Sequence, residues 1–395
     1  MSDLQITRNA EFPDTLRVAR ARSLPNLGPL MLFFSGGSAL NEIAQVLKLY
    51  THNSIHLITP FDSGGSSQVL RDAFGMPAVG DLRSRLMALA DESVLGQPDI
   101  FRLFSYRLPA RASAAELSAE FTELLDGCHR LMKAISQPMR SLILSQIKVF
   151  AAQCPTDFDF AGASVGNLIL AGGYLANDRA LEPVLFLMSK MVAVQGTVRA
   201  IVDQNLDIGA VLSDGSMVPT QRLMTGKEVA PITAPIRELF LSQNGARLSR
   251  DDVVLPKRNR KLIGQADLIC YPPGSLYSSV IANLLPKHTG RSIAQRRVPK
   301  VYLPSLGSDP ECPGMSLTDQ VAAILAALRA DAGADCPVAD LISVVLCDGD
   351  SFDAAETAQL KARFGLPLVA LPLKKADNPQ RYDPVKVCEA LLSLT

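Results

Sequence analysis

The chain has 395 residues, 48% of them hydrophobic, which is more than one hydrophobic core usually serves, so we expect one large α/β domain with lobes or two domains. Its 39 Lys and Arg residues balance 39 Asp and Glu residues, and this zero formal net charge argues against a bulk nucleic-acid binder or an anionic-membrane binder. No stretch approaches the roughly 20 apolar residues of a membrane span, and the polar first residues do not resemble a secretion signal.

The cysteines and histidines indicate a cytoplasmic protein without a zinc site formed by cysteine or histidine side chains. Seven cysteines are scattered with no close pair, which is typical of reduced thiols. The four histidines show no metal-ligand spacing.

The first strand and its turn follow a loose arm predicted over residues 1–28. A continuous apolar run at 30–34 is typical of a central parallel strand. The sequence SGGS at 35–38 comes directly after it, and a helix is predicted over 40–50. This strand–glycine–helix junction lacks the full dinucleotide fingerprint, because Ala39 is not glycine.

A second junction follows the strand predicted over 55–58, which ends before Pro60. Asp62 comes next, at the carboxyl end of that strand. A turn of two glycines and two serines follows, and the serines are predicted to cap a helix over 68–74. The four turn residues are Gly64, Gly65, Ser66 and Ser67. Free N–H groups and the helix dipole favour a phosphate at such a junction, although an ordinary capped turn has the same pattern.

Two further helix starts carry polar groups. Gly80 and Asp81 open a helix with Arg83 and Arg85 in its first turn, where arginine can grip a bound anion. Later, Ser164, Gly166 and Asn167 begin an apolar helix predicted over 168–175, after a helical lobe predicted over 113–136 and 139–153. The segment FRLFSYRL at 101–108 is interpreted as a loop or short strand.

Residues 198–261 are predicted to form a small β-rich lobe. Short β-runs at 198–202, 208–212 and 236–241 are separated by turn signals. The basic run PKRNRK at 256–261 is interpreted as a solvated loop, with nucleic-acid binding as the less favoured alternative.

The alternation of strands and helices resumes at 268–271. Pro272 and Pro273 stop this strand, Gly274 turns the chain, and Ser275 is predicted to cap a helix that runs to Leu285. Strands at 301–303, 341–346 and 366–371 then alternate with helices at 317–329, 354–364 and 384–394. This rhythm predicts a doubly wound, mostly parallel, Rossmann-like sheet with right-handed crossovers.

In such a sheet the junctions lie along one edge. Several phosphate-sized turns on one edge predict a ligand with a diphosphate, such as a nucleotide conjugate. Asp62 is the best candidate to hold Mg²⁺ against it, since Mg²⁺ usually takes one or two carboxylates plus phosphate oxygens. Asp81 could be a second ligand, although a helix cap is its more probable role. Catalysis would rest on positioning and charge neutralisation of a phosphoryl group.

Four segments resemble the signature blocks of the CofD-like family: SGGSAL (35–40), THNSIHLITPFDSGGSSQVLRDAFGMPAVGDLRSRLMALAD (51–91), SVGNL (164–168) and PPGSLYSSVIANLL (272–285). That family contains 2-phospho-L-lactate transferase and a gluconeogenesis-factor branch that binds UDP-sugars. The motifs GGSS, GDLR and GSLYSS are more similar to the gluconeogenesis-factor branch than to the transferase. The sequence of residues 51–65 also resembles the GAK-system CofD-like subgroup. The resemblance implies a Rossmann-like body and a homodimer.

The resemblance also implies that Gly36, Gly37 and Ser38 contact phosphate, that Asp62 serves a metal or the acceptor, and that Asn167 and residues 274–277 line a nucleotide pocket. The sequence departs from the branch pattern at several positions that bear on UDP-sugar specificity and metal-dependent transfer. These positions are Ala39, Ser63, Ala163, Pro272 and Ser305.

Together, these observations assign the catalytic and metal-binding role to Asp62. The predicted nucleotide- and phosphate-binding residues are Gly36, Gly37, Ser38, Gly64, Gly65, Ser66, Ser67, Arg71, Gly80, Asp81, Arg83, Ser164, Gly166, Asn167, Gly274, Ser275, Leu276 and Tyr277. The predicted domain plan has an arm (1–28), a Rossmann-like body (29–197 and 262–395, with a helical lobe at about 113–153) and a β-rich lobe (198–261).

Three functions stay open on this evidence. The first is a regulatory protein that binds a nucleotide-diphosphate conjugate of the UDP-sugar kind. The second is a Mg²⁺-dependent phosphoryl-group transferase of the 2-phospho-L-lactate transferase type. The third is an interaction module whose pocket is vestigial. None of the three requires a nucleic-acid or membrane partner.

Overall fold

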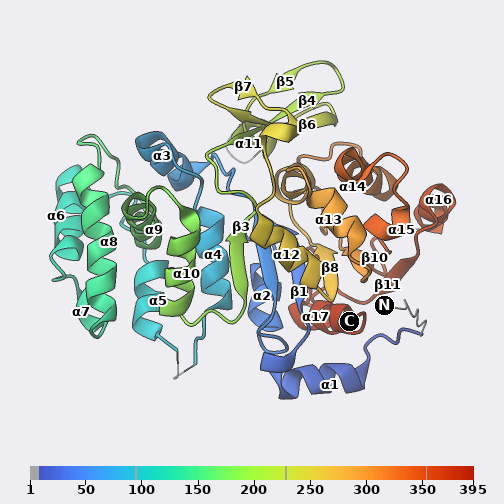
Figure 1. The fold of residues 1–395 in the computed structure, drawn as a ribbon, viewed down its shortest axis with the longest axis horizontal. Helices are drawn as coiled ribbons and strands as arrows, with labels where there is room; N and C mark the ends of the chain where they lie inside the picture. Colours follow the sequence, from blue (N-terminus) through green and yellow to red (C-terminus); the bar gives the residue numbers. More distant parts are fainter. Residues whose placement is uncertain (1–8, 94–95, 227–228, 353) are drawn as a thin grey trace.

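The computed structural model describes residues 9–93, 96–226, 229–352 and 354–395. Parallel strands form a seven-stranded central sheet in the order β11-β10-β9-β8-β1-β2-β3 (Figure 1). The strands are β1 (Met31–Ser35), β2 (Ile55–Ile58), β3 (Thr197–Ala200), β8 (Leu268–Tyr271), β9 (Lys300–Tyr302), β10 (Val344–Asp348) and β11 (Leu368–Leu371). This sheet, with helices on both faces, confirms the predicted doubly wound α/β class.

The interior strand β1 is buried along its whole length, and its side chains alternate between two cores. Met31 and Phe33 belong to the core on one face, with α2 (Asn41–Leu47) and α17 (Pro384–Leu392). Leu32 and Phe34 belong to the core on the other face, and the helices there are α12 (Lys257–Gln265), α13 (Thr289–Gln295) and α14 (Leu317–Ala332). A strand covered on both faces needs an unbroken apolar run, which is the pattern seen at 30–34.

The helical lobe lies beside β3, at the left of Figure 1. Its helices are α4 (Gly80–Leu89), α5 (Pro98–Ser105), α6 (Ala114–Leu125), α7 (Arg130–Ala134), α8 (Met139–Gln153), α9 (Val165–Ala176) and α10 (Leu181–Met191). The prediction of one helix over 113–136 is wrong, because Gly127 takes a left-handed φ of 72° and ends the first helix. The loop or strand predicted at 101–108 is also wrong, because Ile100, Leu103 and Phe104 recur at helical spacing and are buried on one face of α5.

A small antiparallel sheet stands over the carboxyl ends of the central strands, at the top of Figure 1. It contains β4 (Asp207–Leu212), β5 (Met217–Val218), β6 (Ile236–Gln243) and β7 (Ala246–Arg247), with α11 (Gln221–Met224) and η2 (Arg250–Asp252). The run at 198–202, which we expected in this lobe, instead forms β3 at the edge of the central sheet, where Thr197 lies opposite Ile55. The domain plan as a whole stays a prediction.

The remaining described elements complete the body. They are α1 (Thr15–Ser23), η1 (Pro25–Leu27), α3 (Gly65–Phe74), η3 (Leu276–Val280), η4 (Ile281–Leu284), α15 (Val338–Leu341) and α16 (Ala354–Phe364). Of the predicted arm, residues 1–8 lie outside the described residues. Its described part holds α1, which contacts α17, and the Asp14 N–H donates to Ser393 Oγ at 2.8 Å.

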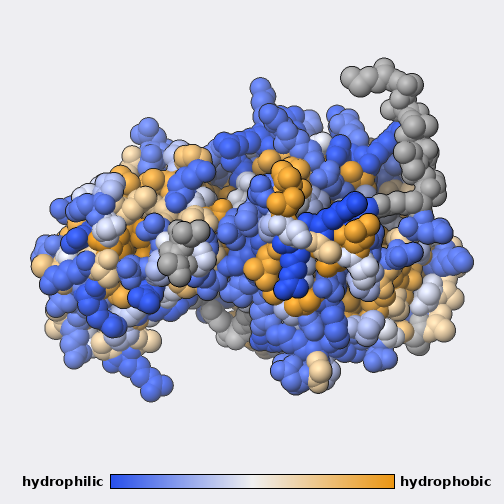
Figure 2. Space-filling view, turned by 90° about the horizontal axis from the view of Figure 1, so that it is seen from below, coloured by the Kyte–Doolittle hydropathy of each residue, from blue (hydrophilic) through white to orange (hydrophobic). Residues whose placement is uncertain are grey.

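The end of the molecule that carries α1 is seen in Figure 2, where hydrophobic patches lie among hydrophilic residues. Exposed apolar side chains in and beside α1 and η1 are Leu16, Leu24 and Leu27. Within the described ranges, no helix is long and apolar enough to span a membrane.

Candidate functional site

The strand order reverses between β1 and β8. The turns that follow these two neighbouring strands start side by side at the carboxyl edge of the sheet, and their chains then continue in opposite directions. In doubly wound sheets this point is the usual ligand crevice. A Cβ added at Gly36 would lie 2.6 Å from Thr59 Oγ1 and 3.0 Å from Ser279 Oγ, and one added at Gly274 would lie 3.6 Å from Ser279 Cβ. The structure therefore brings the turns after β1, β2 and β8 together. We call Gly36, Thr59, Gly274 and Ser279 the Gly36 group.

A second cluster joins four predicted residues from separate segments. A Cβ added at Gly80 would lie 2.8 Å from Ser67 Oγ, 3.8 Å from Asn167 Nδ2 and 3.9 Å from Asp62 Oδ2. These residues come from α4, α3, α9 and the loop after β2, and we call them the Asp62 group. A hydroxyl, an amide and a carboxylate therefore converge on Gly80 at the first turn of α4, and the hydroxyl lies so close that a side chain there would have to displace it.

A hydrogen bond joins Gly37 and Asp81, the residues that follow Gly36 and Gly80 in the two groups. The N–H of Gly37, which has a left-handed φ of 45°, donates to Asp81 Oδ2 at 2.7 Å. Asp81 lies in the first turn of α4, whose N-cap position is Val79, so the predicted capping role for Asp81 is wrong. An amide expected to face phosphate already binds a carboxylate of the chain itself.

Arg83 of α4 holds the Asn167 side chain of the Asp62 group in place. Arg83 Nε donates to Asn167 Oδ1 at 2.8 Å, and its Cδ lies 2.7 Å from the position of a Cβ on Gly166. Only glycine at 166 leaves room for this arginine, which fixes the Asn167 amide. Burial lowers the pKa of Arg83 to about 10, and nearby Arg107 contributes, so Arg83 remains charged at neutral pH.

The start of α3 differs from the prediction. The N-cap is Gly64, and Ser66 and Ser67 lie in the first turn, so the predicted serine caps are wrong. Asp62 Oδ1 accepts the Gly64 N–H at 3.2 Å, which leaves Oδ2 toward Gly80.

Arg71 contacts the Asp62 group through the main chain, because its Nη1 donates to the Asp62 carbonyl at 3.4 Å. It is buried, pairs with Asp207 at 2.8 Å and donates to the Leu206 carbonyl at 2.9 Å. Its contacts therefore tie α3 to the small lobe, and its guanidinium is occupied by protein partners.

The turn after β8 contains the largest departure from the predicted site. The Leu276 N–H donates to Asp309 Oδ2 at 2.7 Å, and the N–H groups of Tyr277 and Ser278 donate to Glu311 Oε2 at 3.1 and 2.8 Å. Two carboxylates of the chain thus occupy the amides that we expected to face a nucleotide. The sequence signal that could have found them is the pair of acids in the proline- and glycine-rich loop after β9.

The same turn also differs in its backbone. The regular helix predicted from Ser275 to Leu285 is instead a π-turn, η3, followed by the 3-10 turn η4. The Val280 N–H donates five residues back, to the Ser275 carbonyl at 3.3 Å. Leu276 and Tyr277 are buried, and the Tyr277 hydroxyl donates to the Ile236 carbonyl of the small lobe at 3.1 Å.

Glu311 is expected to make stability depend on pH. Burial, with the neighbouring Asp309 charge, raises the pKa of its carboxyl from 4.5 to about 7. The folded chain then holds this proton more tightly than the unfolded chain does, so the stabilisation is complete below the unfolded pKa and is lost as pH rises through the folded pKa. Relative to Glu311→Gln, the wild type should lose up to about 3 kcal/mol between about pH 4.5 and 7.5.

Urea unfolding of both proteins across this pH range measures the difference. A Glu116→Gln variant is the control, since this carboxylate is fully exposed and its pKa is lowered by the Ser113 hydrogen bonds. Parallel pH profiles for wild type and Glu311→Gln would contradict the expected titration.

A cavity opens beside each group. One of about 330 Å³ adjoins the Asp62 group, and one of about 510 Å³ adjoins the Gly36 group. The first is lined by Gly65, Ser66, Val69, Leu70, Arg107, Phe158, Asp159, Ala161, Gly162, Ala163, Ser164, Asn167 and Leu168. The second is lined by Ser38, Ala39, Asn41, Glu42, Ile43, Gln45, Pro273, Ser305, Leu306, Gln380, Arg381 and Tyr382. In the first cavity, Ser164 Oγ is buried with no hydrogen-bond partner among the described residues.

Metal-binding groups are sparse here. In the described part of the chain, no group of three or more His, Cys, Asp or Glu side chains could hold a metal ion by itself. Asp62 is the one carboxylate of the Asp62 group. The ligand roles of all these residues stay predictions.

Comparison with known proteins adds a family relationship. A family model described as 2-phospho-L-lactate transferase CofD matches residues 31–384. A putative gluconeogenesis factor of Nostoc sp. is 28% identical over 82% of this chain, and one of Clostridium acetobutylicum is 26% identical over 75%. The chain spans 57% and 53% of the length of these two relatives. The gluconeogenesis factor of Bacillus subtilis is 26% identical over 71% of this chain and 69% of that protein.

A solved structure shares the fold. The crystal structure of a UPF0052 family protein from Bacillus halodurans matches this chain with a TM-score of 0.66 at 22% sequence identity. The match covers 92% of this chain and 99% of the other.

Proposed function

This chain belongs to the CofD family, and we propose that it is a regulatory protein that binds a nucleotide-diphosphate conjugate of the UDP-sugar kind across the two groups. The observation that carries the proposal is the convergence of Asp62, Ser67 and Asn167 on Gly80, beside a cavity of about 330 Å³. A missing side chain, a hydroxyl, an amide and a helix start together suit a phosphate oxygen. The relatives are named gluconeogenesis factors, a name that specifies no reaction, and this supports a binding role over a catalytic one.

The two cavities support an elongated ligand. If its pyrophosphate lies near the Asp62 and Gly36 groups, its base end occupies one cavity and its sugar end occupies the other. The cavity beside the Gly36 group contains the amide side chains of Gln45 and Gln380, which can donate to and accept from a base. The cavity beside the Asp62 group is more apolar, with Phe158, and also contains the unpartnered Ser164 hydroxyl, which suits a sugar.

Mg²⁺ fits the donor set of the Asp62 group. The Asp62 carboxylate and the Ser67 hydroxyl supply hard oxygen ligands, and Mg²⁺ usually completes its shell with phosphate oxygens and water. Asp62 would hold the ion, which would neutralise charge on the diphosphate. Asn167, held by Arg83, would orient one phosphate oxygen.

Binding should therefore depend on Mg²⁺ through Asp62. We expect a UDP-sugar at 100 times its Kd to stabilise the wild type by about 2.7 kcal/mol, with weaker stabilisation when EDTA removes the metal. Asp62→Asn should remove the difference between the Mg²⁺ and EDTA samples. Thermal shift and calorimetry with a panel of UDP-sugars and guanosine conjugates measure this.

The matched control is Asp72→Asn, which removes the same charge from the opposite end of α3, where Asp72 accepts from Gln68 one turn before it. An unchanged Mg²⁺ dependence in Asp62→Asn would defeat the role of Asp62. If no member of the panel stabilises the wild type, the vestigial interaction module becomes the better description.

A second candidate is a Mg²⁺-dependent phosphoryl-group transferase. It is favoured by the orientation of Asp62, whose Oδ2 faces the space at Gly80 while Oδ1 accepts the Gly64 N–H. Turnover of a diphosphate donor, followed by mass spectrometry and lost in Asp62→Asn, would support transfer over binding alone. The homodimer also stays a prediction, and light scattering of the purified chain tests it.

A further inference from the structure

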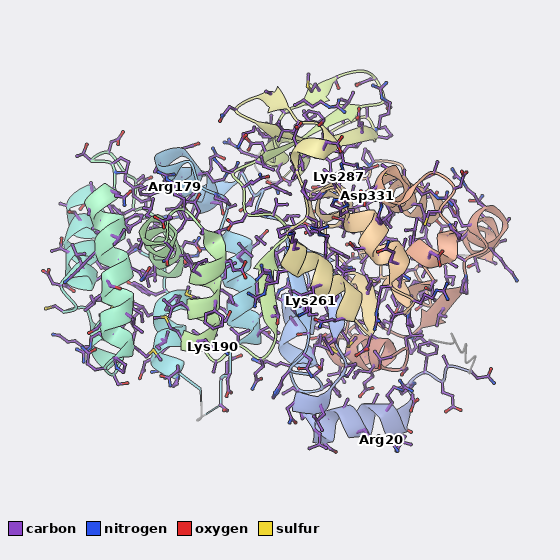
Figure 3. The ribbon with its side chains drawn as sticks, viewed as in Figure 1. Arg20, Arg179, Lys190, Lys261, Lys287 and Asp331 are labelled. Atoms are coloured by element: carbon purple, nitrogen blue, oxygen red, sulfur yellow. The ribbon has the colours of Figure 1, made fainter. Side chains whose placement is uncertain are left out.

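A basic groove lies between α12 and α13, on the face of the sheet turned to the viewer in Figures 1 and 3. It has a volume of about 430 Å³ and is lined by Arg260, Lys261, Gly264, His288, Arg291, Ser292, Gln295 and Arg296. Four of these side chains are cationic and none is acidic. In a chain with zero formal net charge, this is a local concentration of positive charge.

The walls of the groove are fixed to each other. The Leu255 N–H, just before α12, donates to the Lys287 carbonyl at 3.0 Å, and the Lys287 N–H donates to the Val253 carbonyl at 2.9 Å. At the start of α13, the N–H groups of His288 and Arg291 both donate to Asp331, each at 2.8 Å. The cationic side chains are therefore presented from a preorganised frame, which lowers the entropic cost of binding.

Two features of the groove leave room and bonding capacity for a ligand. A Cβ added at Gly264 would meet nothing within 4 Å, so the groove is open beside α12. Arg260 Nε is buried and has no hydrogen-bond partner among the described residues. An unpaired buried guanidinium nitrogen costs free energy, which an anion accepting its N–H would recover.

Carboxylates at both ends limit the size of that anion. Asp331 stands at the His288 end, close to Lys287 (labelled in Figure 3), and Lys287 pairs with Asp251 at 2.6 Å. Asp267 stands at the other end, 3.8 Å from Arg296. An extended phosphodiester backbone leaving the groove would meet negative charge at both ends, whereas a compact anion would not.

We propose that the α12–α13 groove binds a compact polyanion, an ion with two or more phosphate groups, at a site separate from the Asp62 and Gly36 groups. The separation follows from the topology. Both helices lead into the amino ends of strands, α12 into β8 and α13 into β9, and Gly264 and Arg296 lie at these ends of the helices. The Asp62 and Gly36 groups lie at the carboxyl ends.

The test uses inorganic tripolyphosphate as the probe, titrated by calorimetry into Gly80→Val protein, in which the space of the Asp62 group is filled. We expect binding that weakens as salt is added. Adding Arg260→Gln and Arg291→Gln should weaken it about tenfold or more, equal to about 1.4 kcal/mol. Lys261→Gln with Arg291→Gln, both exposed, gives a second variant that does not touch a buried group.

The matched control is Arg111→Gln with Lys133→Gln, which removes two exposed charges from the helical lobe. Equal weakening in this control, or unchanged affinity in both groove variants, would overturn the proposal. Tighter binding of a single-stranded oligonucleotide than of tripolyphosphate would also overturn it, in favour of a nucleic-acid surface. Because the Asp62 group is blocked throughout, failure of the proposed UDP-sugar function would not affect these outcomes.

Discussion

Gly80→Val is expected to abolish binding of the nucleotide conjugate while leaving the fold intact. The new Cβ would lie 2.8 Å from Ser67 Oγ and within 4 Å of Asn167 and Asp62, so the valine would displace the Ser67 hydroxyl and cover the groups that are proposed to face the phosphate. Gly80 does not have a left-handed φ, so the substitution adds no backbone strain there. We expect Kd to rise about 100-fold or more, equal to about 2.7 kcal/mol.

Calorimetry with the best UDP-sugar of the panel measures the loss, and urea unfolding measures the stability. The matched control is Gly264→Ala in α12, which is another helical glycine but has open space around it. That control should keep ligand affinity and gain up to about 1 kcal/mol of helix stability. Full affinity in Gly80→Val would show that the ligand does not use the Asp62 group.

Arg85→Met is expected to cause the largest stability loss among single substitutions at this edge of the sheet. Arg85 is 1% exposed and donates to Asn41 Oδ1 at 3.0 Å, His56 Nδ1 at 3.1 Å and the Gly37 carbonyl at 3.4 Å. Because Arg85 is a donor, His56 Nδ1 must accept, which leaves the Nε2 proton for Ser54 Oγ at 3.1 Å. Burial and the Arg85 charge hold the pKa of His56 well below its usual value, so the ring is neutral.

Methionine keeps much of the volume of Arg85 but supplies no donor, so the buried His56 Nδ1 and two partly buried oxygens lose their partner. At about 1 to 3 kcal/mol for each unsatisfied group, we expect a loss of about 3 kcal/mol or more. Urea unfolding measures it, with Arg102→Met as the control, because Arg102 is exposed and pairs with Asp99 three residues before it on the same helix. A loss of unfolding free energy below about 1 kcal/mol would show that the hydrogen bonds of Arg85 do not stabilise this edge of the sheet as proposed.

The sequence predicted the central sheet well because its strands are covered on both faces. The strands at 55–58 and 268–271 have the predicted bounds, since continuous apolar runs bounded by polar or proline residues mark buried parallel strands. Short segments were less predictable. α5 begins with proline and has only eight residues, so its helical period was too brief to distinguish from a strand.

The candidate site was predictable in its location and less so in its bonding. Parallel strand ends share one edge, and this placed Asp62, Gly80 and Asn167 near each other before any coordinates. The carboxylates that occupy backbone amides could not be inferred in the same way. Glu311 reaches Tyr277 across 34 residues, and Asp81 reaches Gly37 across 44, and such pairings arise only from tertiary packing.

The position of α17 has a consequence for how the protein is made. Phe33 of β1 belongs to the same core as Val387 and Leu391 of α17, so part of one face of this interior strand is covered by a helix more than 350 residues later. On the ribosome α2 can cover its own part of this face early, but the part that α17 covers stays exposed until α17 has been translated and released. The nascent chain therefore carries a partly uncovered apolar strand for most of its synthesis, and chaperone binding during translation is expected at β1.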